Sequence, residues 1–332
     1  MTEQLSSGAG GFARSGAGAR AAPSEAGATP DAATTWHPAF ATDMQLTLSR
    51  LGRGATDPTH QVAADGAVWR TTLTVEGPAS MRFTQHDLHT LRCEAWGEGA
   101  HAAVAAASAL VGEADDPTGF VADHPRLHDA HRRFPGLRIP RTGLVLESLI
   151  PAILEQKVIS VQATASWRAL VRAHGTPAPG PTPANMVVGP SNRAWQLIPS
   201  WEWHRAGVDP RRSRTVMLAL QVARQLQSGV NLSPAEAAAR LRTVPGVGVW
   251  TAAEVAQRAL GDADALSVGD FHLSNMIGHS LFGRDMTDTE MIVAMQKWQP
   301  HRYRVVRLLE AGGATLKPRR GPRLSFVDHR LH

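Results

Sequence analysis

The sequence predicts an α+β protein in which a small antiparallel β domain precedes a mainly helical region. Two patterns favour this class. From Met44 to about Gly97, the apolar and β-branched residues follow the two-residue period of strands. After Asp116, the apolar residues instead recur at helical spacing. The clearest helical stripe consists of Leu146, Leu149, Ile150, Ile153 and Leu154. Strands that precede helices in this way are typical of the α+β class.

The composition is that of a folded protein with two or three domains. The chain has 332 residues, of which 43% are hydrophobic, enough to build real cores. Its single cysteine, Cys93, excludes an internal disulfide framework, a cysteine-based zinc site and a four-cysteine iron–sulfur cluster. No apolar run reaches the roughly 18 residues of a membrane helix, and no apolar signal-peptide core precedes residue 34. We therefore expect a cytoplasmic protein without a membrane partner.

The first part of the chain divides into an extension and a β domain. Residues 1–33 are mainly Gly, Ala and Ser, which bury too little apolar surface to become ordered, so we expect a disordered extension. Residues 34–115 form the predicted antiparallel α+β domain. Its expected strands are 44–51, 68–75, 81–84 and 88–96, followed by a helix over about 100–111.

Residues 116–315 form the predicted helical core, and residues 316–332 a basic tail. We expect one helix from Leu146 to His174, ended by Gly175 and followed by a Pro-rich linker over 176–183. In the helix predicted over 233–242, Ser233 is suited to be the N-cap, with Glu236 at the capping-box position. The other expected helices are 201–207, 214–227, two after Pro245, and a last one that includes 305–310.

Most of the net positive charge lies near the carboxyl end. The whole chain has a net charge of +5, whereas residues 299–332 alone have seven Arg and one Lys against Glu310 and Asp328, a net of +6. Such a cluster can neutralise phosphates, but a solvated helix face with a loose tail explains it equally well. The basic residues are Arg302, Arg304, Arg307, Lys317, Arg319, Arg320, Arg323 and Arg330.

The most informative stretch is a predicted turn between two helices. Its residues are Val244, Pro245, Gly246, Val247 and Gly248, and the second helix begins near Val249. Two glycines allow a tight turn and close approach by another molecule's backbone. The free amides at the start of a helix bind phosphate oxygens, so this pattern suits a hairpin that holds DNA without reading its sequence. The alternative is an ordinary turn between packed helices.

A carboxylate follows the hairpin at a regular distance. Asp270 lies 22 residues after Gly248, about one helix and a loop further along the chain. Aspartate is a good N-cap, so Asp270 can simply begin the helix that starts at Phe271. A carboxylate at a helix N-terminus also stays ionised more easily, which makes the capping role compatible with a chemical one.

Hairpin and aspartate together resemble the helix-hairpin-helix (HhH-GPD) glycosylases of base-excision repair, and within them most closely the 3-methyladenine, or alkylation-repair, DNA glycosylases. The family pattern Pro-Gly-x-Gly-x-x-Thr-Ala runs from Pro245 to Ala252 and includes Thr251, and the family's catalytic aspartate falls on Asp270. The resemblance covers about residues 117–310 and implies a helical core of two lobes. Two weaker matches are segment 152–158, Ala-Ile-Leu-Glu-Gln-Lys-Val, and Trp298-Gln-Pro-His-Arg302.

The resemblance implies a DNA-3-methyladenine glycosylase that hydrolyses the N-glycosidic bond of flipped-out alkylated purines and leaves an abasic site. Relatives that also cut the strand have a Lys two residues after the second hairpin glycine, where this chain has Trp250, so we expect no lyase activity. The partner would be double-stranded DNA that contains damaged bases, and we expect a monomer. Two alternatives stay open: a glycosylase for deaminated or oxidised purines, and a non-catalytic DNA-binding protein.

Further site residues follow from the same resemblance. Trp250, Trp203 and Phe271 are candidates for the base pocket because electron-rich rings hold a cationic base, and Trp201 is a weaker candidate; all can equally be core residues. The tip formed by Gln156, Lys157 and Val158 matches the wedge that fills the vacated base stack, although a lysine there departs from the family. Arg302 is the candidate for the DNA backbone.

We expect no metal and no cofactor, apart from a monovalent cation that relatives hold at the hairpin. His124, His128 and His131 have the spacing of one helix face, but Pro125 and Pro135 interrupt the segment and no carboxylate pattern accompanies it. His272, two residues after Asp270, could touch DNA, although a structural role explains it better.

Overall fold

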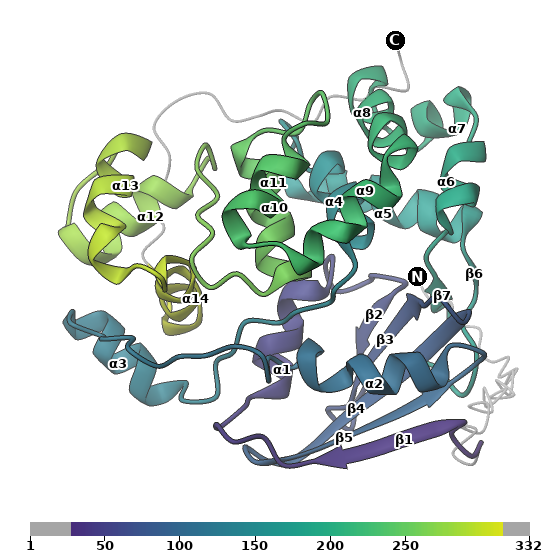
Figure 1. Cartoon of the computed structure of the whole chain (residues 1–332), viewed down its shortest axis with the longest axis horizontal. Coiled ribbons are helices and arrows are strands. Elements are labelled where there is room, and N and C mark those ends of the chain that lie inside the picture. The colour runs from purple at the N-terminus through teal and green to yellow at the C-terminus, as the bar shows by residue number, and fades with distance from the viewer. Residues whose placement is uncertain (1–27, 315–332) are drawn as a thin grey trace, which may run out of the picture.

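The computed structural model describes residues 28–314 and shows the sheet and helical parts packed against each other (Figure 1). The predicted extension lies mainly outside the described residues, and the basic tail, 316–332, lies wholly outside them. The α+β class is confirmed: an antiparallel sheet comes first, and helices follow. Among residues 28–314, no helix is long and apolar enough to cross a membrane.

The sheet has five antiparallel strands in the order β1-β5-β4-β3-β2. Helix α2 (Ala100–Leu110) covers one face, where its alanines allow close packing against the apolar side of β4 and β5 (Figure 1). Cys93 is buried in this core and is a free thiol. The strands are β1 (Ala32–Trp36), β2 (His60–Val62), β3 (Val68–Leu73), β4 (Pro78–Asp87) and β5 (Thr90–Trp96).

Two predictions for this part were wrong. Segment 44–51, expected as a strand, is helix α1 (Met44–Leu48) with a 3-10 turn. Asp43 caps it by accepting a hydrogen bond from Leu46 N, and the buried Met44, Thr47 and Leu48 lie one helical turn apart. Over so few residues, the spacing of Met44, Leu46 and Leu48 fits the two-residue period of a strand as well as the 3.6-residue period of a helix. Strand β1, for its part, begins inside the segment expected to be disordered, because it pairs along its full length with β5.

The helical part forms two lobes with separate apolar cores, in agreement with the prediction. The first lobe continues from α11 into a π-helical turn, Ala256–Leu260, and a small pair of strands, β6 (Thr176–Pro177) and β7 (Val187–Val188), lies beside it. Its helices are α4 (Val145–Leu154), α5 (Ser160–His174), α6 (Asn192–Leu197), α7 (Ser200–Arg205), α8 (Pro210–Gln221), α9 (Ala223–Gln227), α10 (Pro234–Leu241) and α11 (Val249–Val255).

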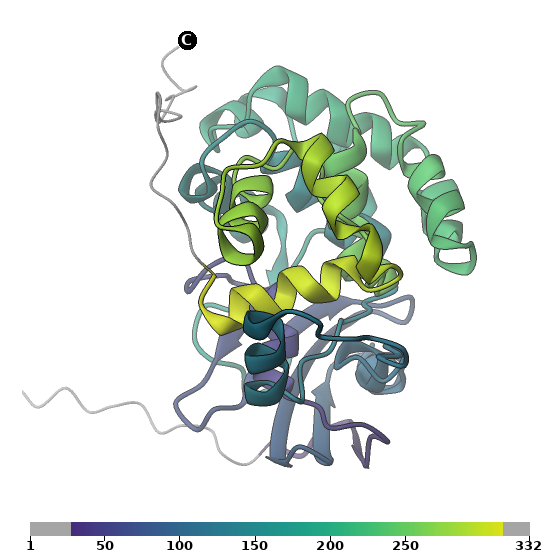
Figure 2. The ribbon, with the colours of Figure 1, turned by 90° about the vertical axis from the view of Figure 1, so that its left-hand side faces the viewer.

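The second lobe lies at the other end of the molecule, with α14 packed across α3 (Figures 1 and 2). A π-helical turn, Gly278–Phe282, extends its helix α12. The helices are α3 (Pro125–Arg133), α12 (Leu273–Ile277), α13 (Asp288–Met295) and α14 (Arg302–Gly312).

The long helix expected from Leu146 to His174 is two helices. The chain leaves α4 after Leu154 and begins α5 only at Ser160, and Lys157 lies between them with φ of 54°, in the left-handed region. A left-handed residue ends a helix, and a lysine adopts this conformation only at a cost. Lys157 is exposed at this break, and residues 156–158 form the tip between the two helices.

Ionic contacts join the sheet to the first lobe. Arg70 of β3 pairs with Glu147 of α4, and Arg53 pairs with Glu155 at 2.8 Å. Arg258 donates from Nε to the carbonyl of Arg50 at 3.1 Å. These pairs, in which Arg70 is buried and both glutamates are half-buried, fix the end of α4 against the sheet domain, and with it this tip.

Candidate active site

The predicted hairpin exists as a buried turn with an exposed crest. Helix α10 begins with the expected capping box of Ser233 and Glu236. Val244 and Val247 point into the core, 3% and 6% exposed, and fix the turn from inside. Gly246 has φ of 92°, and a Cβ there would lie 2.4 Å from Thr215 Oγ1 on α8, so this position requires glycine twice over.

Gly248 has the opposite surroundings. Its φ of −96° suits any residue, and a Cβ there would meet no heavy atom within 4 Å. Gly248 is the N-cap of α11, and no side chain caps this end. The first amides of a helix have no partner inside the helix, so those of α11 are open to an acceptor from outside. Because Gly248 has no side chain, an acceptor from outside can reach these amides without obstruction.

The end of α4 is joined directly to the hairpin. Gln156 donates from Nε2 to the carbonyl of Gly246 at 3.0 Å and to Thr251 Oγ1 at 2.8 Å. Arg212 of α8 donates to the carbonyl of Leu154 at 2.6 Å. The side chain of Gln156 thus supports the hairpin, and of the predicted wedge residues only Lys157 is fully exposed, with Val158 half-buried.

Asp270 lies beside the start of α11. Its Oδ1 accepts from the backbone N–H groups of His272 at 2.8 Å and Leu273 at 3.1 Å. The helix expected to start at Phe271 begins instead at Leu273, with His272 as its N-cap, so Asp270 fixes the turn before α12. Its Oδ2 accepts from Nε1 of Trp250 at 3.1 Å. The half-buried carboxylate therefore has one oxygen fixed by the backbone and the other aimed at the aromatic ring of the hairpin helix.

Comparison with solved structures identifies the fold that holds these residues. A 3-methyladenine DNA-glycosylase from Archaeoglobus fulgidus matches 84% of this chain and 98% of its own, with a TM-score of 0.71 at 15% identity. An 8-oxoguanine glycosylase/lyase from Clostridium acetobutylicum matches 85% of this chain and 96% of its own, with a TM-score of 0.65 at 12% identity. The chain has the helix-hairpin-helix DNA glycosylase fold. At these identities the likeness establishes the fold alone.

A curated protein gives a sequence match of higher identity. It is a Mycobacterium tuberculosis protein named probable bifunctional transcriptional activator/DNA repair enzyme AlkA, 31% identical over 180 residues. The match covers 54% of this chain and 35% of that protein, so the chain spans about a third of its curated relative. No protein-family model matches the chain.

In this glycosylase fold, two of the predicted aromatic residues do not reach the site. Trp203 is 3% exposed, stacks on Trp195 at 5.7 Å and donates to the carbonyl of Ile198, so it is a core residue and the pocket prediction was wrong. Trp201 is 65% exposed, but both lie on α7, at the opposite end of the molecule from α12 (Figure 1). Phe271, next to Asp270, is 41% exposed and meets His272 edge to face.

Arg302 is not free for a DNA backbone. It forms a two-pronged pair with Asp264, at 2.8 Å from Nε and 2.6 Å from Nη2. This pair ties the start of α14 to the loop that leads to Asp270. Arg304 and Arg307, from the predicted basic cluster, are buried and paired with Asp115 and Glu310. The three described arginines of that cluster are therefore structural, because each guanidinium already has a carboxylate.

Sequence patterns missed the arginines around the hairpin, although Lys157 was among the predicted wedge residues. Lys157, Arg211, Arg214 and Arg242 are exposed, and none forms an ion pair with another residue in 28–314. Arg211 and Arg214 belong to the first turns of α8, next to Thr215, which contacts Gly246. The signal available was a cluster of arginines just after the Asp209-Pro210 helix start, but its position beside the hairpin depends on tertiary packing.

The histidine segment is a helix start. Pro125 is the first residue of α3 and His124 its N-cap, so the proline does not interrupt the segment as expected. Proline suits this position because its missing N–H would have no partner there. Within residues 28–314, no group of three or more His, Cys, Asp or Glu is placed to hold a metal ion.

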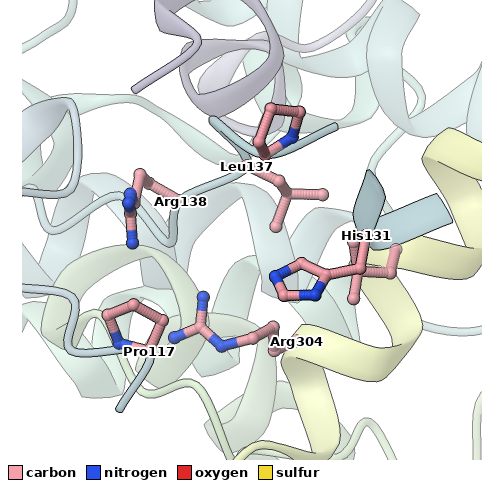
Figure 3. Close-up of a pocket in the computed structure, with 7 residues that line it drawn as sticks. Pro117, His131, Leu137, Arg138 and Arg304 are labelled. Atoms are coloured by element: carbon pink, nitrogen blue, oxygen red, sulfur yellow. The ribbon is translucent and has the colours of Figure 1, made fainter. Parts of the chain in front are cut away.

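A cavity of about 60 Å³ lies between α3 and α14 (Figure 3). It is lined by Pro117, His131, Leu137, Arg138 and Arg304, among others. Burial, Arg304 and Arg138 lower the pKa of His131, in that order of effect. None of the candidate site residues reaches this cavity, so it has no part in the arrangement around Asp270.

Proposed function

We propose that the protein is a monofunctional DNA glycosylase that releases alkylated purines, 3-methyladenine and 7-methylguanine, from double-stranded DNA. The observation that supports this most is the hydrogen bond between Trp250 and Asp270. It joins an electron-rich ring and a carboxylate at the start of the hairpin helix, the two groups that a cationic base and a sugar cation require.

The hairpin would bind the DNA backbone. The amides from Gly248 onward offer donors to one phosphate. Three exposed cations lie beside the hairpin. Lys157 is next to Gln156, which donates to the carbonyl of Gly246, and Arg211 and Arg214 lie on α8 beside Thr215, which packs close to Gly246. Such a surface binds phosphates without reading sequence, and the affinity falls as salt rises.

The chemistry would rest on the outer oxygen of Asp270. Cleavage of the N-glycosidic bond develops positive charge on the sugar, as in other glycoside hydrolysis. With Oδ1 held by two backbone amides, Oδ2 would face the sugar and stabilise that charge or orient water. A preorganised charge in such a site is worth roughly a hundredfold in rate. An alkylated purine is already cationic and leaves without a strong general acid, so we propose no cofactor.

The chain would leave an abasic site uncut. A lyase needs an amine that attacks the sugar, and Trp250 stands at the family's lysine position. Lys157 lies on the tip after α4 rather than on the hairpin helix. Trp250 and the adjacent Phe271 would instead hold the flipped base by their ring faces.

The test is base release from methylated duplex DNA, with Asp270→Asn as the matched variant. Asparagine keeps an oxygen for the capping bonds, so binding should persist while release stops. Free 3-methyladenine or 7-methylguanine, with strand breaks only after alkali, is the expected result. Release of a deaminated or oxidised purine instead would show that the substrate is another class of damaged base. Binding without any release would favour a non-catalytic DNA-binding protein.

A further inference from the structure

The loop that leads to Asp270 is held by one face of the hairpin helix. Trp250, Glu254, Gln257 and Arg258 recur along α11 and its π-helical extension at the spacing of a single face. The first binds Asp270 directly. Glu254 and Gln257 both bond to Ser267 in the loop, three residues before Asp270. Arg258 pairs with Glu254.

Ser267 is saturated with contacts. Its hydroxyl donates to Glu254 Oε1 at 2.5 Å and accepts from Gln257 Nε2 at 2.9 Å. Its carbonyl accepts from the backbone N–H of Asp270 at 3.0 Å. Gln257 Nε2 also reaches the carbonyl of Ala265 at 2.9 Å. One small side chain therefore connects the hairpin helix to the turn from which the Asp270 carboxylate extends.

Glu254 links Ser267 to Arg258 within this group of buried polar side chains. It is 8% exposed and pairs with Arg258 at 2.7 Å, and Arg258 in turn donates to the carbonyl of Arg50 in the sheet domain. Burial by itself would raise the pKa of Glu254, but Arg258 and Arg50 outweigh burial and lower it to about 2. An ionised acceptor makes a stronger and shorter hydrogen bond than a neutral one.

We propose that Ser267 is a positioning residue for Asp270, held in place by Glu254 and Gln257. This inference rests on the proposed function, because it assigns to Asp270 the chemistry described above. Ser267 itself does not touch the substrate. It fixes the backbone from which the carboxylate extends, and the bonds of Asp270 to Trp250 and to the start of α12 then fix the carboxylate itself.

The test compares Ser267→Ala with Ser166→Ala. Ser166 is also buried, 1% exposed, but its hydroxyl bonds to the carbonyl of Gln162 within α5, away from the loop. We expect Ser267→Ala to slow single-turnover base release about tenfold, since small misplacements of a reacting group are costly. Affinity for a duplex with an abasic analogue should stay within about twofold of wild type, because the hairpin is unchanged. The Ser166 variant should match wild type in rate.

A second variant keeps the test open if Ser267→Ala folds poorly. Gln257→Met is close in volume, and Gln257 Oε1 is buried without a partner, so the loss of the amide leaves no new unpaired group on that side chain. It removes the donor to Ala265 and Ser267, and should slow release with unchanged DNA affinity.

Amide hydrogen exchange over residues 264–272 gives a measurement that does not depend on activity. Faster exchange in Ser267→Ala and Gln257→Met, but not in Ser166→Ala, is expected. Unchanged exchange and an unchanged rate, or equal losses in Ser166→Ala, would overturn the positioning role. A wild-type protein that releases no base would overturn the proposed function instead, while the exchange experiment would still decide how the loop is held.

Discussion

Gly248→Ala separates DNA binding at the hairpin from the stability of the hairpin. In the protein alone, the added methyl group meets nothing within 4 Å, and the backbone there suits alanine. The smaller freedom of alanine in the unfolded chain stabilises by about 0.4–1 kcal/mol, and the replacement of a glycine N-cap by alanine costs roughly 0.5–1 kcal/mol. The free energy of unfolding should therefore change by less than about 1 kcal/mol.

A phosphate bound to the hairpin amides would meet this methyl group. We expect the affinity for a duplex with an abasic analogue to fall about tenfold, which is about 1.4 kcal/mol. Fluorescence anisotropy at low salt measures the affinity, and thermal unfolding measures the stability. Unchanged affinity would refute phosphate binding by these amides. A large loss of stability would refute the conclusion that a Cβ at position 248 meets no other atom of the protein.

Gly246→Ala is the informative contrast on the same hairpin. Its Cβ would lie 2.4 Å from Thr215 Oγ1, and φ is 92°. Strain of this kind costs about 1–3 kcal/mol, so this variant should unfold several degrees earlier than wild type. The two glycines would then have different roles: the fold requires Gly246, whereas the bound phosphate requires Gly248.

The remaining predictions concern charges and the indole. The double variant Arg211→Ala/Arg214→Ala should flatten the dependence of log affinity on log salt by about 1.8, for two phosphate contacts, whereas Arg224→Ala on α9 should leave the slope unchanged. Trp250→Phe should slow base release about tenfold with little effect on DNA affinity, because it loses the donor to Asp270 and keeps the ring; an unchanged single-turnover rate would show that the bond is dispensable. The pKa of Glu254, about 2, lies below its unfolded value, so its stabilising effect is complete above about pH 4.5 and is lost as the pH falls toward 2. Thermal unfolding of wild type should fall more steeply across that window than that of Glu254→Gln, and parallel curves would contradict this.

Local patterns predicted the parts of the site that depend on chain geometry. The capping box at Ser233 and the turn from Val244 to Gly248 follow from a few adjacent residues, and both appear in the structure. The expected helix start at Phe271 was two residues too early, but Asp270 still accepts from two backbone N–H groups at the start of α12. The contact between Trp250 and Asp270 could be expected only from the family resemblance, because 20 residues separate them in the chain.

What local patterns missed was decided by tertiary partners. Trp203 was a pocket candidate because an electron-rich ring suits a cationic base, but three stacked indoles place it in the core. Arg302 finds Asp264, a partner 38 residues away that no spacing rule indicates. Strand β1 forms because β5 offers it an edge, despite a sequence of small residues. Conversely, Ser267 has no motif of its own, and only its contacts with α11 distinguish it.

The central claim is that Asp270 does the chemistry on DNA held by the hairpin. Single-turnover release of 7-methylguanine from a duplex, measured for wild type and Asp270→Asn at saturating protein, tests it most directly. We predict rapid release by wild type, a loss of at least about a hundredfold in the variant, and equal affinity of both for the duplex. Release by Asp270→Asn at the wild-type rate, with binding intact, would contradict the account.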